Sequence, residues 1–367
     1  MGGEIERDPI TREPTGVLKE SAMDLLDRFI PEPTRADLRE ALLRALKHAN
    51  SLGVTSVHDM SQMADLDVFR QASEQNTLTV RITAYLSVED WSARLTDAVQ
   101  AKELWTAPMF RLAGFKGFMD GSLGSRTAYM REPYADATPT TLHPRGQLTA
   151  FASSQTFQQQ IIQADAKELQ IAIHAIGDEG IHLLLDGYEA AAKQNGSTNR
   201  RHRVEHAQHL LVSDIPRFAK LGVVASMQPF HKADDGRYAE KAIGAERLKG
   251  SYAFRQLVDA KALVVFGSDW PVVTLNPFAG IDSAVNAKTL SGEVWLPSHS
   301  LTVEEALRAY TVSPPKAIHQ ELRLGTLEAG KLADIVILVD DLLTMPRERL
   351  AEVKVAQTIV GGKVVYP

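Results

Sequence analysis

The sequence contains no cysteine among its 367 residues. Disulfide bonds, iron–sulfur clusters and thiolate metal sites are therefore excluded, and any metal ion must be held by His, Asp, Glu or Lys chemistry. No uninterrupted apolar run approaches the length of a membrane span, and the polar opening stretch, residues 1–16, does not have the pattern of a signal peptide. We therefore expect a cytoplasmic protein with no membrane partner.

Long basic runs are also missing. The formal net charge at pH 7 is -6, so nucleic acid is not an expected partner. No glycine-rich dinucleotide fingerprint follows a first strand, which makes a doubly wound open sheet the weaker alternative for the fold. The chain is 44% hydrophobic and 23% charged, which is the composition of an ordinary globular protein with a large core.

Short apolar segments of strand type alternate with amphipathic segments of helix type. The predicted strands are 54–57, 78–86, 110–119, 170–174, 203–206, 222–227 and 262–266. The predicted helices are 35–52, 91–104, 157–169, 178–194, 214–221 and 254–260. This alternation predicts a parallel sheet covered by helices, and polar residues where the strands end favour a (β/α)₈ TIM barrel. Only seven strands can be counted, whereas a closed barrel of this type has eight.

Other stretches break this pattern. Residues 17–30 are predicted to form a short amphipathic helix, while 130–150 and 232–250 are predicted to be loops, the first of them a lid. The tail has strand patterns at 334–338 and 358–360 and a Gly-Gly hairpin turn, which predict a small β appendage. We therefore divide the chain into a barrel domain, residues 1–320, and an appendage, residues 321–367.

Four side chains that bind metals or move protons stand at the ends of separate predicted strands: Lys116, His174, His206 and Asp269. Taken singly, each has a structural explanation, such as a lysine that pairs with a nearby carboxylate or an aspartate that caps a helix. Together they suit a hydrolytic metal centre, because imidazole and carboxylate groups bind Zn²⁺, which lowers the pKa of bound water. Asp269 would then take the proton of that water and pass it to the leaving group. A neutral Lys116 amine that adds CO₂ would become a carbamate able to bridge two ions.

The ordered motifs FKGFMDGSLGSRTA, IAIHAIGD, RVEHAQ, SMQPFH, GSDWPV and GTLEAGKLADIVIL span most of the chain. Together they resemble the amidohydrolase superfamily, in the branch called amidohydrolase family 3, which includes N-substituted formamide deformylases. The resemblance implies a metal-dependent hydrolase that acts on a carbon–nitrogen bond of a small-molecule amide, with one or two divalent ions, Zn²⁺ foremost. It places Lys116, His174, His206 and Asp269 on the metal and catalytic positions. It also implies that four neighbouring residues shape substrate binding: Asp120, Arg126, His231 and Trp270.

One departure from that family matters. Its members carry a His-x-His pair at the end of the first barrel strand, and this sequence has none. We therefore expect an incomplete barrel that lacks the first βα unit and half of a β-sandwich appendage, and that binds metal weakly. The rival hypothesis is a non-catalytic remnant of the fold that acts as a binding protein. A metal-free aldolase or isomerase with Lys116 as a Schiff base is weaker, because it leaves the two histidines and Asp269 without roles. The sequence leaves open whether the protein forms a homo-oligomer.

Overall fold

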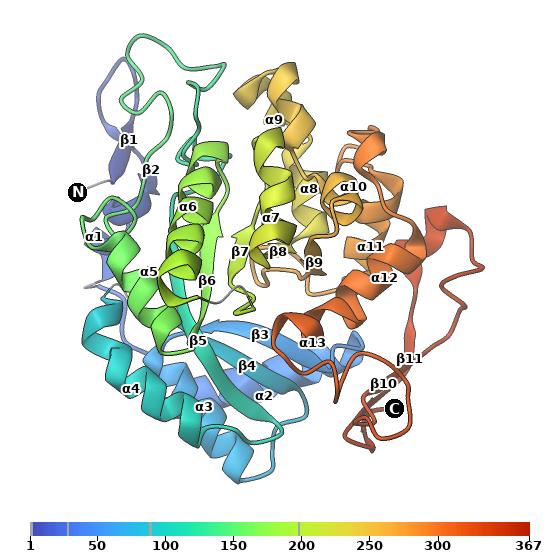
Figure 1. Ribbon diagram of the computed structural model, residues 1–367. Helices are drawn as coiled ribbons and strands as arrows, with labels where there is room; N and C mark the ends of the chain where they lie inside the picture. The colour runs from blue at the N-terminus through green and yellow to red at the C-terminus, as the bar shows by residue number, and fades with distance from the viewer. Residues whose placement is uncertain (1–2, 28, 88–89, 197–198) are drawn as a thin grey trace.

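The computed structural model describes residues 3–27, 29–87, 90–196 and 199–367 (Figure 1). Seven parallel strands form one sheet, and their spatial order is their order in the chain. They are β3 (Ser56–Ser61), β4 (Arg81–Ser87), β5 (Phe110–Phe118), β6 (Gln170–Ala175), β7 (Arg203–His206), β8 (Val224–Met227) and β9 (Leu263–Phe266). In the described part of the chain β3 and β9 do not pair with each other, so the sheet is a curled, open half barrel.

Helices surround this sheet, and the apolar side chains of both bury one large core. The longer helices are α2 (Arg35–Ser51), α3 (Met63–Glu74), α4 (Trp91–Leu104), α5 (Phe157–Ala166), α6 (Asp178–Asn195), α11 (Pro277–Asn286) and α12 (Val303–Thr311). The shorter ones are α1 (Asp24–Asp27), α7 (Ile215–Leu221), α8 (Pro229–Asp235), α9 (Ala239–Ile243), α10 (Phe254–Asp259) and α13 (Ser313–Ala317). No helix in the described ranges is long and apolar enough to cross a bilayer. The cytoplasmic location stays a prediction.

Helix α2 shows why these segments form where they do. The Thr34 side chain accepts a hydrogen bond from the Asp37 amide at 3.2 Å, and the Asp37 carboxylate accepts one from the Thr34 amide at 2.9 Å. This capping box satisfies two amide groups that a helix start leaves without partners. Leu42 and Leu46, four residues apart, then face the core. All seven predicted strands are present in the structure.

Two predicted elements are wrong. Residues 17–30 do not form one helix: β1 (Glu4–Arg7) and β2 (Pro14–Lys19) make an antiparallel hairpin, followed by a 3₁₀ turn (Glu20–Ala22) and the single turn of α1. Pairing of Leu18 with Ile5 overrides the local helical pattern. The predicted loop 232–250 is instead mostly helical, with α8, α9 and a 3₁₀ helix (Ala245–Gly250), because its small apolar residues are buried among the polar ones.

The loop at 130–150 contains no helix or strand among its described residues, as predicted. Its two halves are fastened together, since the Tyr134 amide donates to the Pro144 carbonyl at 2.7 Å and the Arg145 guanidinium donates to the Met130 carbonyl at 2.9 Å. The Tyr134 hydroxyl also donates to the Ala128 carbonyl at 2.8 Å. The loop is therefore anchored to the segment that follows β5. Its role as a lid stays a prediction.

The C-terminal residues form a three-stranded antiparallel sheet of β10 (Ile335–Leu338), β11 (Val355–Val360) and β12 (Lys363–Tyr366). Gly361 and Gly362, both with positive φ, turn the chain between β11 and β12 as predicted. This sheet is joined to the barrel by a buried ion pair between Arg81 and Asp334, with 2.6 Å between Nε and Oδ2. A β-sandwich appendage and the domain boundary at residues 320 and 321 stay predictions.

Candidate functional site

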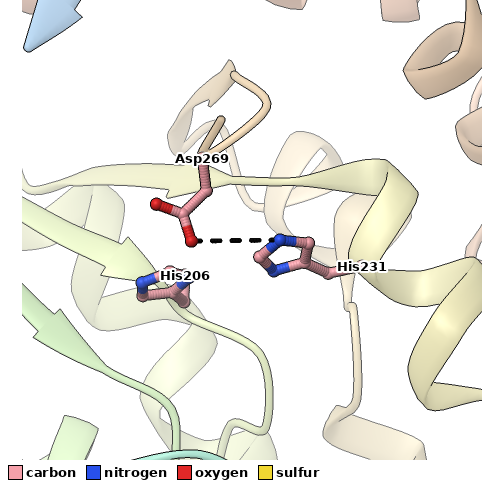
Figure 2. Close-up of side chains that lie close together, drawn as sticks. All are labelled: His206, His231 and Asp269. Atoms are coloured by element: carbon pink, nitrogen blue, oxygen red, sulfur yellow. Dashed lines mark ion pairs between the residues drawn. The ribbon is translucent and has the colours of Figure 1, made fainter. Parts of the chain in front are cut away.

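Three side chains from three neighbouring strand ends meet in one place (Figure 2). His206 is the last residue of β7, His231 lies in the first turn of α8 directly after β8, and Asp269 follows β9. One nitrogen or oxygen from each lies within 4.8 Å of the others. We call these residues the strand-end triad. Parallel strands place their carboxyl ends on the same side of the sheet, which is why residues so far apart in sequence converge.

The geometry of the triad suits a divalent cation. The distance from His231 Nε2 to Asp269 Oδ2 is 3.9 Å, and the two imidazole rings stack with their centroids 5.9 Å apart. His206 Nδ1 and His231 Nε2 are buried and have no hydrogen-bond partner among the described residues. A buried polar atom without a partner is costly unless something else binds it. Two such nitrogens beside a carboxylate are a donor set that Zn²⁺ and similar ions accept.

His174, at the end of β6, lies beside the triad without belonging to it. Its ring centroid is 4.4 Å from that of His206. Its Nε2 is 3.0 Å from the carbonyl oxygen of Gly121, and because a carbonyl only accepts, this nitrogen carries the proton. Burial, reinforced by the nearby Lys116 charge, lowers the pKa of His174 to about 3, so the ring is neutral at pH 7. Its Nδ1 lone pair is left for another partner.

Lys116 on β5 is buried and has no carboxylate at ion-pair distance among the described residues. Its Nζ donates to the Gly117 carbonyl at 2.7 Å and lies 3.4 Å from the centroid of the Phe118 ring. Burial lowers the pKa of Lys116 to about 7, although the carboxylates of Glu205 and Asp269 oppose this change. A sizeable share of the amine is thus neutral at pH 7, which is the form that adds CO₂. Burial likewise raises the pKa of Asp269 to about 6.

A second polar group fills the barrel interior. Arg203 donates to Glu205 at 2.6 Å, to the Ser226 hydroxyl at 2.8 Å and to His58 Nδ1 at 2.6 Å. His58 follows the predicted strand 54–57, but the observed strand β3 extends past it, and its Nδ1 accepts a hydrogen bond from Arg203. The structure therefore does not place His58 in the triad.

The residues predicted to shape substrate binding are spread over the site. Asp120 has no exposed side-chain surface, and it accepts hydrogen bonds from the amides of Tyr129, Ile176 and Gly177 at 2.7–3.0 Å. These contacts join the loops after β5 and β6, and contact of Asp120 with substrate stays a prediction. Trp270 is 45% exposed beside the triad.

Arg126 lies further out. It forms an ion pair with Asp136 at 2.7 Å and lines a polar cavity of about 300 Å³. The cavity lies between the β1–β2 hairpin and the loop at 130–150, with Lys19, Thr127 and His143 in its wall. Of the residues predicted to bind substrate, the structure therefore places His231 in the strand-end triad and Arg126 at this cavity.

Two features of the site were missed from sequence. The sequence predicts His231 to be a substrate-binding residue, although its place after a strand in the SMQPFH motif is the same signal that marks His174 and His206 as metal ligands. The second feature is Glu20, which no sequence pattern marks. Its φ of 50° is unusual for a residue other than glycine, and its Oε1 lies 2.2 Å from the position that a Cβ on Gly121 would take. The 3₁₀ turn after the N-terminal hairpin therefore places a carboxylate next to Gly121, whose carbonyl accepts the hydrogen bond from His174.

Known proteins resemble this chain over its whole length. It is 37% identical to the protein LONG AFTER FAR-RED 3 of Arabidopsis thaliana, over all of this chain and 64% of that protein. It is 28% identical to the N-substituted formamide deformylase of Arthrobacter pascens, over all of this chain and 67% of that enzyme. The chain thus spans about two thirds of the length of these curated relatives.

A solved structure shows the same fold. An uncharacterized metal-dependent hydrolase from Pyrococcus horikoshii OT3 superposes with a TM-score of 0.78 at 28% identity, covering 94% of this chain and 68% of that one. The family described as the amidohydrolase family matches residues 1–366. The strand-end triad and the parallel sheet that positions it are consistent with this match. The chain belongs to the amidohydrolase family.

Proposed function

We propose that this chain carries the metal site of a hydrolase that cleaves the carbon–nitrogen bond of a small, non-peptide amide. The observation that carries the proposal is the strand-end triad, in which two imidazoles and a carboxylate converge. Each imidazole has a buried nitrogen without a hydrogen-bond partner among the described residues. Family membership and the metal-dependent hydrolase from Pyrococcus support the metal-dependent chemistry. The similarity to a formamide deformylase supports an N-substituted formamide or a related amide as the substrate.

His206, His231 and Asp269 would hold the ion, with His174 and a carboxylated Lys116 as further ligands of the same or a second ion. When bound, Zn²⁺ or a similar ion lowers the pKa of a water molecule and polarises a carbonyl group. The neutral state of His174 and His206 suits this assignment, because burial lowers the pKa of both rings and only an unprotonated nitrogen binds a metal.

Asp269 is the proposed proton shuttle. Its side chain is 38% exposed, whereas that of His231 is 12% exposed, so Asp269 is the more open of the two to substrate and water. A carboxylate next to a metal-bound water can accept a proton from it and return that proton later. Asp269 would take a proton from the attacking water and deliver it to the leaving nitrogen. Trp270, next to it and exposed, and Arg126, in the polar cavity, are proposed to contact the substrate.

The rival function is a metal-free binding protein. The open edges of β3 and β9, and a site built without a His-x-His pair, favour it. The two functions differ in one measurable property, which is zinc binding at the triad.

The test uses the purified chain, its His231→Ala variant and a control, His182→Ala, whose imidazole pairs with Asp214 between the outer helices. Bound Zn²⁺ is measured by elemental analysis and by competition with a chromophoric chelator, and amine release is measured with N-substituted formamides. We expect the parent and the control to bind Zn²⁺ and release amine, and His231→Ala to bind at least tenfold more weakly. A parent that binds no Zn²⁺ would refute the metal site and favour the rival, and a parent that binds Zn²⁺ but hydrolyses no amide would refute the amide substrate.

A further inference from the structure

Asp235 is a buried carboxylate that no sequence motif marks and the proposed reaction does not use. It is the last residue of α8, four residues after His231, so the two side chains lie on the same side of this short helix. Only 6% of the residue is exposed. In the described part of the chain no Lys or Arg forms an ion pair with it, and the nearest basic atom is His209 Nε2 at 3.9 Å. A carboxylate buried in this way needs hydrogen bonds from neutral groups.

Three neutral side chains supply them. The side-chain amide of Gln208 donates to Asp235 Oδ2 at 2.7 Å, and the Tyr252 hydroxyl donates to the same oxygen at 2.6 Å. The Tyr238 hydroxyl donates to Oδ1. One carboxylate therefore joins three separate segments of the chain. It connects α8 to the segment that follows β7.

Gln208 makes this connection relevant to the triad, because it lies only two residues after His206. Its own carbonyl accepts a hydrogen bond from the Tyr252 amide at 2.6 Å, so Gln208 is held on both sides. Asp235 thus links the helix that carries one triad histidine to the segment that carries the other. The two rings lie 5.9 Å apart and are inclined by 12° to each other.

Helix α8 depends on contacts with the rest of the chain for its position. It has seven residues, and its first residues receive no side-chain cap. So short a helix is not stable by itself and takes its position from tertiary contacts. Its far side packs closely on the 289–296 segment: the Lys232 amine donates to the Leu296 carbonyl at 3.2 Å, and a Cβ on Gly236 would lie 2.6 Å from Thr289. Packing holds the outer side, and Asp235 holds the side that faces the site.

We propose that Asp235 is a positioning residue that sets the separation of His206 and His231 by fastening α8 to the segment after β7. This inference rests on the proposed metal site for its consequence, since the spacing of the two imidazoles decides whether one ion reaches both. Residues that orient metal ligands typically change metal affinity by about 10–100-fold when they are replaced. Asp235 acts through the histidines and does not touch the ion.

The experiment compares Asp235→Ala, Asp235→Asn and Tyr252→Phe with a matched control, Asp214→Ala. Asp214 is equally buried and accepts hydrogen bonds from His182 at 2.9 Å and Arg217 at 3.2 Å, but it joins outer helices away from the triad. Two properties are measured: the Zn²⁺ dissociation constant by chelator competition, and hydrogen exchange of the α8 amides by mass spectrometry in the zinc-free protein. The thermal midpoint of each variant is recorded as a measure of global stability.

We expect Asp235→Ala to bind Zn²⁺ about 10–100-fold more weakly and to exchange its α8 amides at least tenfold faster. Asp235→Asn and Tyr252→Phe, which keep part of the link, should give smaller changes in the same direction, and they decide the matter if the alanine variant does not fold. Asp214→Ala should lower the thermal midpoint and leave both properties of the site unchanged. Unchanged α8 exchange in all three site variants would overturn the proposal, as would an equal loss of Zn²⁺ affinity in the control. A parent that binds no Zn²⁺ refutes the proposed function alone, because the exchange measurement still decides the role of Asp235.

Discussion

Replacement of Asp269 should mainly lower the reaction rate, whereas replacement of a triad histidine should mainly weaken metal binding. Replacement by Asn keeps an oxygen that binds a metal ion but removes the group that accepts a proton. We expect Asp269→Asn to retain much of the bound Zn²⁺ and to lower turnover of a formamide substrate by about 10²–10⁴-fold. Elemental analysis and steady-state kinetics measure the two effects, with the distant Asp259→Asn as the control. Turnover equal to that of the parent would remove Asp269 from the reaction.

The sequence showed which residues were candidates for the site better than it showed which of them meet in space. Lys116, His174, His206 and Asp269 stood out because each lies at or near the end of a strand, and a parallel sheet brings strand ends together. The sequence could not show that His231 reaches the same point, because its position depends on how α8 leaves β8. It also could not show that Asp120 is enclosed by backbone amides, since those amides come from two distant loops.

A glycine inside β5 tests how closely the strands of the sheet approach. A Cβ on Gly114 would lie 1.9 Å from the carbonyl oxygen of Gln170 on β6, whereas a Cβ on Gly267, just after β9, would meet nothing within 4 Å. Gly114→Ala must therefore push two paired strands apart, and overpacking of this kind costs about 1–3 kcal/mol or more. We expect the urea midpoint of Gly114→Ala to fall clearly below that of the parent, and that of Gly267→Ala to stay near it. Equal midpoints for the two variants would contradict this account of the sheet.

The ion pair between α10 and α12 gives a pH-dependent prediction. Glu305 also completes the capping box of α12 with Thr302, and its bond to Arg255 lowers the Glu305 pKa to about 2. A carboxyl group with a depressed folded-state pKa stabilises the protein above its unfolded-state pKa, near 4.5, and loses that effect as the pH falls toward 2. Glu305→Gln should therefore be less stable than the parent at pH 7, by about 1 kcal/mol for a partly exposed pair.

Urea unfolding at several pH values measures this difference. The gap between the parent and Glu305→Gln should shrink steadily below pH 4.5. An exposed i,i+4 pair, Glu304 with Arg308, provides the control, and Glu304→Gln should change stability little at any pH. A gap that stays constant down to pH 2 would mean that the ion pair contributes nothing through the charge of Glu305.

Elements were predicted well where local pattern and tertiary contacts agree, and poorly where they conflict. The capped helix α2 and the buried strands β5 and β7 were read closely because their caps and apolar runs are local. The β1–β2 hairpin was missed because a strand is defined by its partner, and the partner of Leu18 lies thirteen residues upstream at Ile5. Helix α8 was missed because its stability comes from Asp235 and from packing on the 289–296 segment, neither of which a local pattern records.

At the scale of the whole molecule, the open sheet has two edges that no described segment pairs. Every residue of β3 except Ser61 is only half-buried, whereas the other edge strand, β9, has three of its four residues buried, so β3 is the more open edge. An edge strand presents free N–H and C=O groups, which favour pairing with another chain. The chain should therefore associate with itself as its concentration rises, and its β3 and β9 amides should exchange with solvent faster than those of β6 and β7. Sedimentation velocity at several concentrations and hydrogen exchange of the same sample measure the two effects, with the interior strands as the internal control. A protein that stays monomeric and protects β3 and β9 as strongly as β6 would show that these edges are closed in solution, and the half-barrel description would then have to be abandoned.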